Sequence, residues 1–387
     1  MTQRTCSTAS LSRPGWLGKA RWPLRVFAVF IIATSLSSLI TSDEWWVRMW
    51  DFPRIQLAVL ALIFSIVLFI FERGTALLLA CALAVCGVWQ TSRVSLYTPF
   101  VSPEMEFATP DPIDNAGEVN AAGLLAPTCF SMLAYNVQQS NRDYARSLAM
   151  LEREDPDIVV LFETDQAWLD ALEPVLARYP ERAARPLANK YGLAFATRLP
   201  VLKKSIQALA EHDTPSVFVT LKAERTFQII GLHPRPPKPG QDTDERDAEL
   251  VIAARYAQTQ NMPVLALGDF NDVAWSDTSS LFKRLGGFLD PRIGRGVYAT
   301  FPSNMTWLGW PLDHVFATPE FTLAELRVLE NTGSDHRAIL ARLCLADDGY
   351  AEGNATPARV DNDDREDAIK IVDEFGDDTR TEQAQGR

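Results

Sequence analysis

The sequence has 387 residues, a formal net charge of −12 and 47% hydrophobic residues, and a chain of this length holds about two or three domains. Thirteen Asp/Glu and five Lys/Arg fall in residues 347–387, so most of the excess negative charge belongs to this tail. The rest of the chain is close to neutral, which indicates neither a basic surface for nucleic acid nor a highly acidic fold.

Three apolar stretches follow a polar N-terminal segment, residues 1–23. They are Leu24–Thr41, Ile55–Phe71 and Thr75–Trp89, within residues 24–91. A membrane-spanning helix needs about 20 apolar residues, and about 17 suffice. Trp residues between the first two stretches and at the end of the third are typical of the membrane interface. We therefore predict three transmembrane helices, with a buried helical bundle of a soluble protein as the alternative.

The N-terminal segment carries more Lys and Arg than the loop after the first apolar stretch, which predicts that the N-terminus stays in the cytoplasm. Three crossings then place everything after Thr91 on the far side. The chain is thus predicted to be a multi-pass protein of the cell inner membrane, in contact with the lipid bilayer, with a periplasmic C-terminal domain. Two crossings would instead return this domain to the cytoplasm.

Residues 92–127 are rich in Pro and lack periodicity, and are predicted to form a linker. From residue 128 to 346 short apolar strands alternate with helical segments, which predicts a layered α/β sandwich rather than a purely parallel doubly wound sheet. The expected strands are Cys129–Val137, Asp157–Phe162, Tyr191–Arg198, Ser216–Lys222, Phe227–His233, Val264–Leu267, Asp313–Thr318 and Arg337–Leu343. The expected helices are Asn141–Glu154, Gln166–Tyr179, Asp242–Gln260 and Leu281–Leu285. Residues 347–387 are predicted to be disordered.

The five cysteines show no CxxC pair and no zinc-site spacing. Cys129 and Cys344 flank the α/β region, and a disulfide between them would fit an extracytoplasmic domain. We expect instead that both are unpaired buried thiols.

Polar side chains stand at the ends of the predicted strands, where α/β proteins tend to place chemistry. They are Asn136, Glu163, His233, Asp269, Asn271, Asp313, Asp335 and His336. Along a strand, residues i and i+2 point to the same face, so Asp269 and Asn271 are predicted to aim at one point. The carboxylate and amide oxygens form a set that suits Mg²⁺ or Mn²⁺ rather than zinc. His336 offers a base beside a metal ligand, and Asp313 would orient its imidazole.

These motifs, in this order, resemble the endonuclease/exonuclease/phosphatase superfamily, and the three apolar stretches ahead of them resemble its membrane-bound bacterial branch. The motifs are Asn136 after a strand, Leu-Phe-Glu-Thr around Glu163, His233, Gly-Asp-Phe-Asn at 268–271, Asp313-His314 and Ser-Asp-His at 334–336. The resemblance covers about Thr128–Leu345. It implies a two-sheet α/β sandwich, preceded by the three transmembrane helices, that hydrolyses phosphoester bonds with a divalent metal.

The resemblance also implies roles for the metal-binding residues and the catalytic His. Glu163 resembles the main metal ligand, and Asn136 and Asp335 resemble supporting groups at the metal. His336 resembles the catalytic His, and Asp313 resembles its partner.

The remaining three residues resemble groups that act on the nucleophile and the phosphate. Asp269 and Asn271 resemble the pair that positions both, and His233 resembles the second His, which contacts phosphate oxygens. Either Asp269 or His336 is the general base. The implied substrate is a phosphoester in nucleic acid, in a lipid headgroup or in a small phosphate ester. The alternative is a non-catalytic binding or scaffolding protein on the same fold, and no protein partner is predicted.

Overall fold

The computed structural model describes residues 15–72, 74, 76–108, 129–210, 212–346 and 351–384. The chain divides into two compact units. The first comprises Met1–Thr41 and Pro53–Arg93, and the second comprises Ser42–Phe52 and Val94–Arg387. Most of the predicted linker, residues 109–127, lies outside the described residues.

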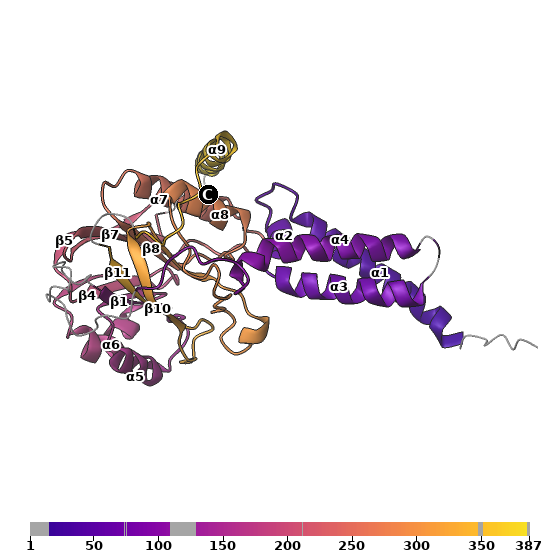
Figure 1. The fold of residues 1–387 in the computed structure, drawn as a ribbon. Coiled ribbons are helices and arrows are strands. Elements are labelled where there is room, and N and C mark those ends of the chain that lie inside the picture. Colours follow the sequence, from indigo (N-terminus) through magenta and orange to yellow (C-terminus); the bar gives the residue numbers. More distant parts are fainter. Residues whose placement is uncertain are drawn as a thin grey trace, which may run out of the picture. The chain divides into compact units, whose positions relative to one another are not determined.

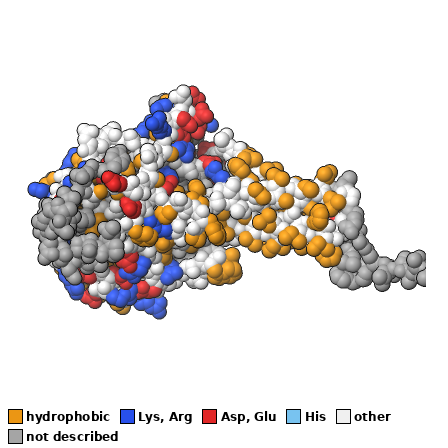
Figure 2. All heavy atoms as spheres, viewed as in Figure 1, with side chains coloured by type: hydrophobic (Ala, Val, Ile, Leu, Met, Phe, Trp, Pro, Cys, Tyr) orange, Lys and Arg blue, Asp and Glu red, His pale blue; other side chains and the backbone are white. Residues whose placement is uncertain are grey.

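The first unit contains three helices, α1 (Gly15–Ser37), α3 (Arg54–Phe71) and α4 (Ala76–Val94). They meet in a small apolar core of Ala28, Ile31, Ala61, Leu68, Ala80, Leu83 and Cys86. Many of their large apolar side chains point outward, and Figure 2 shows these hydrophobic groups along the helices.

Two helices of the described residues are long and apolar enough to cross a membrane, Arg54–Phe71 and Ala76–Tyr97. The described apolar part of α1, Trp22–Ser37, is shorter. The three predicted apolar stretches thus all form helices, and two of them reach the length of a span.

The second unit stacks two β-sheets face to face, with helices on both outer faces (Figure 1). The first sheet has the order β10-β11-β1-β2-β4-β3 and the second the order β5-β6-β7-β8-β9. The strands of the first sheet are β1 (Cys129–Asn136), β2 (Ile158–Phe162), β3 (Glu181–Arg185), β4 (Leu193–Thr197), β10 (Phe321–Val328) and β11 (Ile339–Leu345). Those of the second sheet are β5 (Val201–Ala208), β6 (Pro215–Lys222), β7 (Thr226–Leu232), β8 (Val264–Asp269) and β9 (Asp313–Ala317). The predicted two-sheet α/β sandwich is confirmed.

Three apolar layers hold this unit together. The central layer lies between the sheets and includes Phe130, Phe162 and Phe227. On the outer face of the first sheet, α5 (Tyr144–Glu154) and α6 (Gln166–Leu176) bury a second layer. On the second sheet, α7 (Asp244–Gln258) and α8 (Asp277–Gly286) bury the third. Because the central strands are covered on both faces, their sequences are nearly continuous apolar runs.

The three strands that the sequence analysis does not predict all lie at sheet edges. They are β3, β5 and β10. β3 reads Glu-Arg-Ala-Ala-Arg, and β5 contains Lys203 and Lys204, with most of their side chains exposed or half-buried. Edge strands of natural proteins often carry such charges, which block pairing with other chains and remove the apolar signal.

Cys129 and Cys344 form a disulfide, so the prediction of two unpaired thiols is wrong. Cys129 opens β1 and faces Cys344 directly in the antiparallel pairing of β1 with β11. The sequence does not reveal this contact because 215 residues separate the two positions.

The acidic tail is partly helical, so the prediction of disorder is wrong for residues 351–384. Helix α9 (Asn362–Ala384) follows an extended segment. Asp364 accepts hydrogen bonds from the guanidinium of Arg284, and Ala368 is buried in the third apolar layer with Ile371 and Val372 packed at its edge. A few apolar residues at helical spacing are enough to hold this helix against α7 and α8.

The segment Ser42–Phe52 belongs to the second unit, although it lies between two apolar helices in the sequence. It contains α2 (Trp45–Arg48) and the 3₁₀ turn η1 (Met49–Asp51). Its backbone is held at both ends. The carbonyl of Asp43 accepts from the amide of Thr243 at 2.9 Å, and the carbonyl of Asp51 accepts from the indole of Trp275 at 2.8 Å.

Candidate active site

The ends of β7 and β8 approach closely, and Gly268 makes this approach possible. Its φ is +138°, and a Cβ at this position would lie 2.0 Å from the carbonyl oxygen of Leu232. Residues with side chains rarely adopt such a φ. Only Gly fits at position 268, and β8 ends at the next residue, Asp269.

Asp269 lies at the centre of the site and is almost completely buried. Its Oδ2 accepts from Nδ2 of Asn136 at 2.9 Å, and its Oδ1 accepts from the amide of Asn271 at 2.9 Å. The Nε2 atoms of His336 and His233 lie 3.5 Å and 3.6 Å from Oδ2. Four other predicted site residues thus meet at the carboxylate of Asp269.

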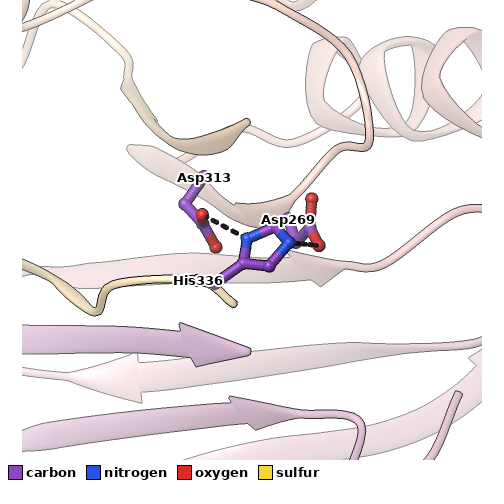
Figure 3. A group of neighbouring side chains, drawn as sticks. All are labelled: Asp269, Asp313 and His336. Carbon is purple, nitrogen blue, oxygen red and sulfur yellow. Dashed lines mark hydrogen bonds and ion pairs between the residues drawn. The ribbon is translucent and has the colours of Figure 1, made fainter. Parts of the chain in front are cut away.

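His336 lies between two carboxylates (Figure 3). Asp313 opens β9 directly opposite Asp269, and its Oδ2 lies 2.8 Å from Nδ1 of His336. Burial alone would lower the pKa of His336, but the charges of Asp269 and Asp313 outweigh it and raise this pKa to about 10. Burial raises the pKa of Asp269, against the opposing effect of His336. The three residues therefore hold a proton on the imidazole between two acids.

His233 follows β7 and is buried, and burial lowers its pKa to about 4 although Asp269 acts in the opposite direction. Its imidazole is neutral at pH 7. Nδ1 is buried and has no hydrogen-bond partner among the described residues. A neutral ring with a free buried nitrogen suits a group that exchanges one hydrogen bond with a bound molecule.

Glu163 follows β2 and faces the same centre. Its Oε1 accepts from Nδ2 of Asn136 at 3.2 Å, and its Oε2 accepts from the amide of Gln139 at 3.0 Å. Its φ is +58°, a region that costs free energy for a residue with a side chain and that is often found at functional sites.

Asp335 lies beside these acids in the loop before β11. Burial raises its pKa, His336 opposes this rise, and the carboxylates of Glu163 and Asp269 add to it. Its Oδ1 is buried and lacks a hydrogen-bond partner among the described residues. The loop is fixed by Ser334, whose hydroxyl donates to the carbonyl of Asn136 at 2.8 Å.

Asn271 reaches the site, but not by the alternation of a strand. β8 ends at Asp269, and Asn271 has a φ of +50°. Its Nδ2 donates to the carbonyl of Pro234 at 2.9 Å, beside His233. The expectation that strand spacing aims Asp269 and Asn271 at one point is therefore wrong, because a turn follows β8 directly.

Some residues that hold the site residues in position were not predicted from the sequence. The backbone N–H of Gln138 donates to Oδ1 of Asn136 at 2.9 Å. Its side-chain Oε1 accepts from the backbone N–H of Asp335 at 3.2 Å. Phe301 lies with its ring centroid 4.9 Å from that of His336. Their residue types carry no chemical signal, and only their place next to a motif or in the folded chain identifies them.

His314 of the Asp-His motif points away from the site. Its ring bonds to the guanidinium of Arg292 at 2.8 Å and to the carbonyl of Asp272 at 2.9 Å. Neighbouring residues of a strand face opposite sides, so Asp313 and His314 cannot serve the same centre.

The residues present fit a divalent cation. Among the described residues, Asp269, Asp313 and His336 have ligand atoms within 4.8 Å of one another, but the imidazole of His336 already lies between the two carboxylates. The nearby carboxylates of Glu163 and Asp335 add two more acids, and oxygen-rich sets of this kind suit Mg²⁺ or Mn²⁺. A buried carboxylate oxygen without a partner, such as Oδ1 of Asp335, is the kind of atom that a cation would satisfy.

A pocket of about 460 Å³ opens next to Asp335. Its lining consists of Gln138, Arg146, Ser303, Asn304, Asn331, Gly333, Ser334 and Asp335. Among these described residues Arg146 is the only cation, and it already pairs with Asp143 at 3.1 Å. The pocket is therefore polar, with amide and hydroxyl groups rather than a cluster of positive charges.

Comparison with known proteins identifies the family of this region. A family model described as the endonuclease/exonuclease/phosphatase family matches residues 133–336, just over half of the chain. A search among curated proteins finds no match.

Several solved structures are similar to the same region. A family protein from Bacteroides thetaiotaomicron has 18% identity and a TM-score of 0.49, and covers 59% of this chain and 99% of its own. D. rerio TDP2 complexed with a single-strand DNA product has 16% identity and a TM-score of 0.47, with 56% and 99% covered. A B. thetaiotaomicron mannosyl-6-phosphatase has 18% identity and a TM-score of 0.43, with 55% and 99% covered.

Proposed function

The chain belongs to the endonuclease/exonuclease/phosphatase family, whose members are usually metal-dependent phosphoester hydrolases, and from this we propose that it is a membrane-anchored hydrolase of phosphoesters that uses Mg²⁺ or Mn²⁺. The observation that carries the proposal is the meeting of Asn136, His233, Asn271 and His336 at the buried carboxylate of Asp269. A scaffolding protein would have no need to bury the imidazoles of His233 and His336 against one carboxylate.

In this proposal water attacks phosphorus, one P–O ester bond breaks, and the released alcohol carries away a proton. Asp313 holds Nδ1 of His336, so that Nε2 faces Asp269. The Asp269–His336 pair takes the proton from the water and returns one to the leaving oxygen. His233, neutral at pH 7, exchanges a hydrogen bond with a phosphoryl oxygen.

Glu163 and Asp335 would hold the cation, and Asn136 would support them by donating its Nδ2 to Oε1 of Glu163. When bound, it would stabilise the negative charge that builds on the phosphoryl oxygens. The positive φ of Glu163 and the unpartnered Oδ1 of Asp335 support this assignment. Nδ2 of Asn136 donates to both Glu163 and Asp269, so one side chain fixes a cation-binding group and a proton-transfer group relative to each other.

The membrane part of the proposal rests on the first unit and on the chain connections. The outward faces of α3 and α4 carry large apolar side chains such as Phe69 and Leu78, which favour lipid over water. Ser42–Phe52 and the residues after Val94 share the second unit, so they lie on the same side of a membrane that α3 and α4 cross.

The side on which the second unit lies is proposed from two independent features. The Lys and Arg residues of the N-terminal segment favour a cytoplasmic N-terminus, and α1 then acts as a third span that places the second unit in the periplasm. The Cys129–Cys344 disulfide supports this placement, because disulfides persist in oxidising compartments. An alkaline phosphatase fusion after Leu345 should be active and the matching green fluorescent protein fusion dark; the reverse pattern would place the unit in the cytoplasm.

The activity is tested with the full-length protein in detergent and bis-p-nitrophenyl phosphate as a generic diester. Hydrolysis should depend on Mg²⁺ or Mn²⁺ and should fall by about 10²-fold or more in Glu163→Gln, which keeps the shape of the side chain but removes its charge. Asp170→Asn changes an exposed acid in α6 and serves as the control. Equal inactivity of wild type and Glu163→Gln with all diester and monoester substrates would contradict the proposal.

A further inference from the structure

The loop Phe301–Trp310 combines an exposed apolar tip with a rigid base. The 3₁₀ turn η3 (Thr306–Leu308) forms the tip. The side chain of Trp307 is 80% exposed and that of Met305 is 45% exposed. Trp and Met are enriched at contact surfaces relative to the rest of a protein's surface.

The base of the loop is fixed to the proposed active site. Phe301 and Trp310 pair through their backbones, and their rings stack with centroids 6.2 Å apart. The amide of Ser303 donates to the carbonyl of Asp335 at 2.7 Å, and the ring of Phe301 lies against His336. The base of the loop therefore contacts two residues of the site, Asp335 and His336.

The same loop also lines the pocket beside Asp335. Ser303 and Asn304 belong to the lining, which otherwise consists mainly of amide and hydroxyl groups. Such groups bind hydroxyls and other small polar groups. A pocket for a nucleic-acid backbone would be expected to carry several cations, whereas among the described lining residues Arg146 is the only one.

We propose that the tip of this loop inserts into the bilayer interface and that the pocket receives the headgroup of a membrane phospholipid, which makes a phospholipid diester the substrate. The inference rests on the proposed hydrolase function. Trp favours the membrane interface, and the chain itself contains two helices able to cross a bilayer. The loop would then hold the lipid phosphate at the Asp269–His336 pair.

The chemistry requires only water and the lipid. Water adds to phosphorus, one P–O ester bond of the diester breaks, and the released alcohol takes up a proton. The products are a phosphate monoester and an alcohol, and no oxidant, reductant or second substrate takes part.

The test uses full-length protein in nanodiscs that contain phosphatidylethanolamine and phosphatidylglycerol. Release of products from these lipids is measured next to hydrolysis of bis-p-nitrophenyl phosphate. The double variant Trp307→Ser, Met305→Ser removes the apolar tip and leaves the pocket lining intact. Leu202→Ser is the matched control, because Leu202 is 59% exposed on the edge strand β5.

We expect the double variant to lose about tenfold or more of its phospholipid hydrolysis, because the apolar contact with lipid is lost. Its rate with the soluble diester should stay within about twofold of wild type, and Leu202→Ser should retain both rates. If the double variant hydrolysed phospholipid at the wild-type rate, the inference would be overturned.

Two further outcomes separate the inference from the function on which it rests. Wild-type protein that cleaves the soluble diester or a single-stranded oligonucleotide, but no phospholipid, would overturn the inference alone. Wild-type protein that cleaves none of these substrates would overturn the proposed hydrolase function as well.

Discussion

Nη2 of Arg48 lies 4.0 Å from Oδ2 of Asp272, so a residue encoded between two apolar helices reaches the loop that follows β8. Nη1 of Arg48 also lies 3.7 Å from Asp247. Asp272 lies 3.6 Å from Arg246, and Arg246 donates to the carbonyl of Asn271 at 3.1 Å. The segment Ser42–Phe52 is therefore joined through buried charges to the backbone of a proposed catalytic residue.

Replacement of Arg48 should destabilise the second unit. Burial would lower the pKa of Arg48, but Asp247, Asp51 and Asp272 outweigh it and raise this pKa, so the side chain is charged. Removal of one partner from a buried ion pair leaves the other charge uncompensated and costs about 3–5 kcal/mol. We expect Arg48→Met to lower the midpoint of thermal unfolding, measured by the near-UV circular dichroism of the full-length protein.

The control for this prediction is Lys204→Met, which breaks a surface pair with Glu181. Both partners of that pair are more than a third exposed, so its loss should cost less than about 1 kcal/mol. Equal unfolding midpoints of Arg48→Met and wild type would show that the charge network does not stabilise the unit.

Asp313→Asn should reduce turnover while the protein remains folded. Asn keeps the size of the side chain but cannot stabilise the imidazolium of His336 or fix its Nδ1 as a donor. Comparable changes in other His–Asp pairs cost about 10²–10⁴-fold in kcat. The value is measured with bis-p-nitrophenyl phosphate at saturating Mg²⁺, with Asp170→Asn as the control. Unchanged kcat in Asp313→Asn would remove Asp313 from the proposed proton-transfer chain.

Glu249 of α7 should make the stability of the second unit depend on pH. It is buried, its Oε1 accepts from the hydroxyl of Ser216 at 2.7 Å, and burial raises its pKa to about 7, against the hydrogen bonds of Ser216 and Thr214. Because the pKa of the folded state exceeds that of the unfolded chain, the favourable contribution is complete below about pH 4.5. It is lost as the pH rises through 7, by about 3 kcal/mol in total.

Glu249→Gln is expected to remove this dependence. Gln keeps the acceptor for Ser216 but cannot ionise, so the variant should unfold at a higher temperature than wild type at pH 8. The two proteins should differ little at pH 4.5. The unfolding midpoints of wild type and variant are compared at pH 4.5 and at pH 8. If the two proteins differed by the same amount at both pH values, Glu249 would not titrate in the folded protein.

Strands with apolar residues on both faces, such as β1, β2 and β8, could be predicted from sequence, because each is buried between two layers. Polar residues at the ends of these strands could be predicted as a site, because α/β proteins tend to place chemistry there. The structure brings Asn136, Asp269, Asp313 and His336 together. The edge strand β5 could not be predicted, because Lys203 and Lys204 replace the apolar pattern.

Other features depend on contacts between distant parts of the chain. The place of Asn271 follows from a turn stabilised by Asp269 rather than from strand spacing. The docking of Arg48 depends on Asp247 and Asp272, about 200 or more positions away in the sequence. No local pattern of residues marks Arg48 as a member of the second unit, since its neighbours Trp45 and Trp46 are equally typical of a membrane interface.

The Cys129–Cys344 disulfide connects stability with the proposed compartment. It joins β1 to β11 and closes a loop of 215 positions, and disulfides of this kind contribute roughly 2–5 kcal/mol. In protein from cells that export the second unit, denatured after acid quenching, Cys129 and Cys344 should react with a maleimide only once a reductant has been added. The double variant Cys129→Ala, Cys344→Ala should unfold at a lower temperature, whereas Cys81→Ala, Cys86→Ala, which changes the two free thiols of α4, should not alter the second unit. If Cys129 and Cys344 react in the denatured protein without a reductant, the second unit resides in a reducing compartment, and the periplasmic placement is wrong.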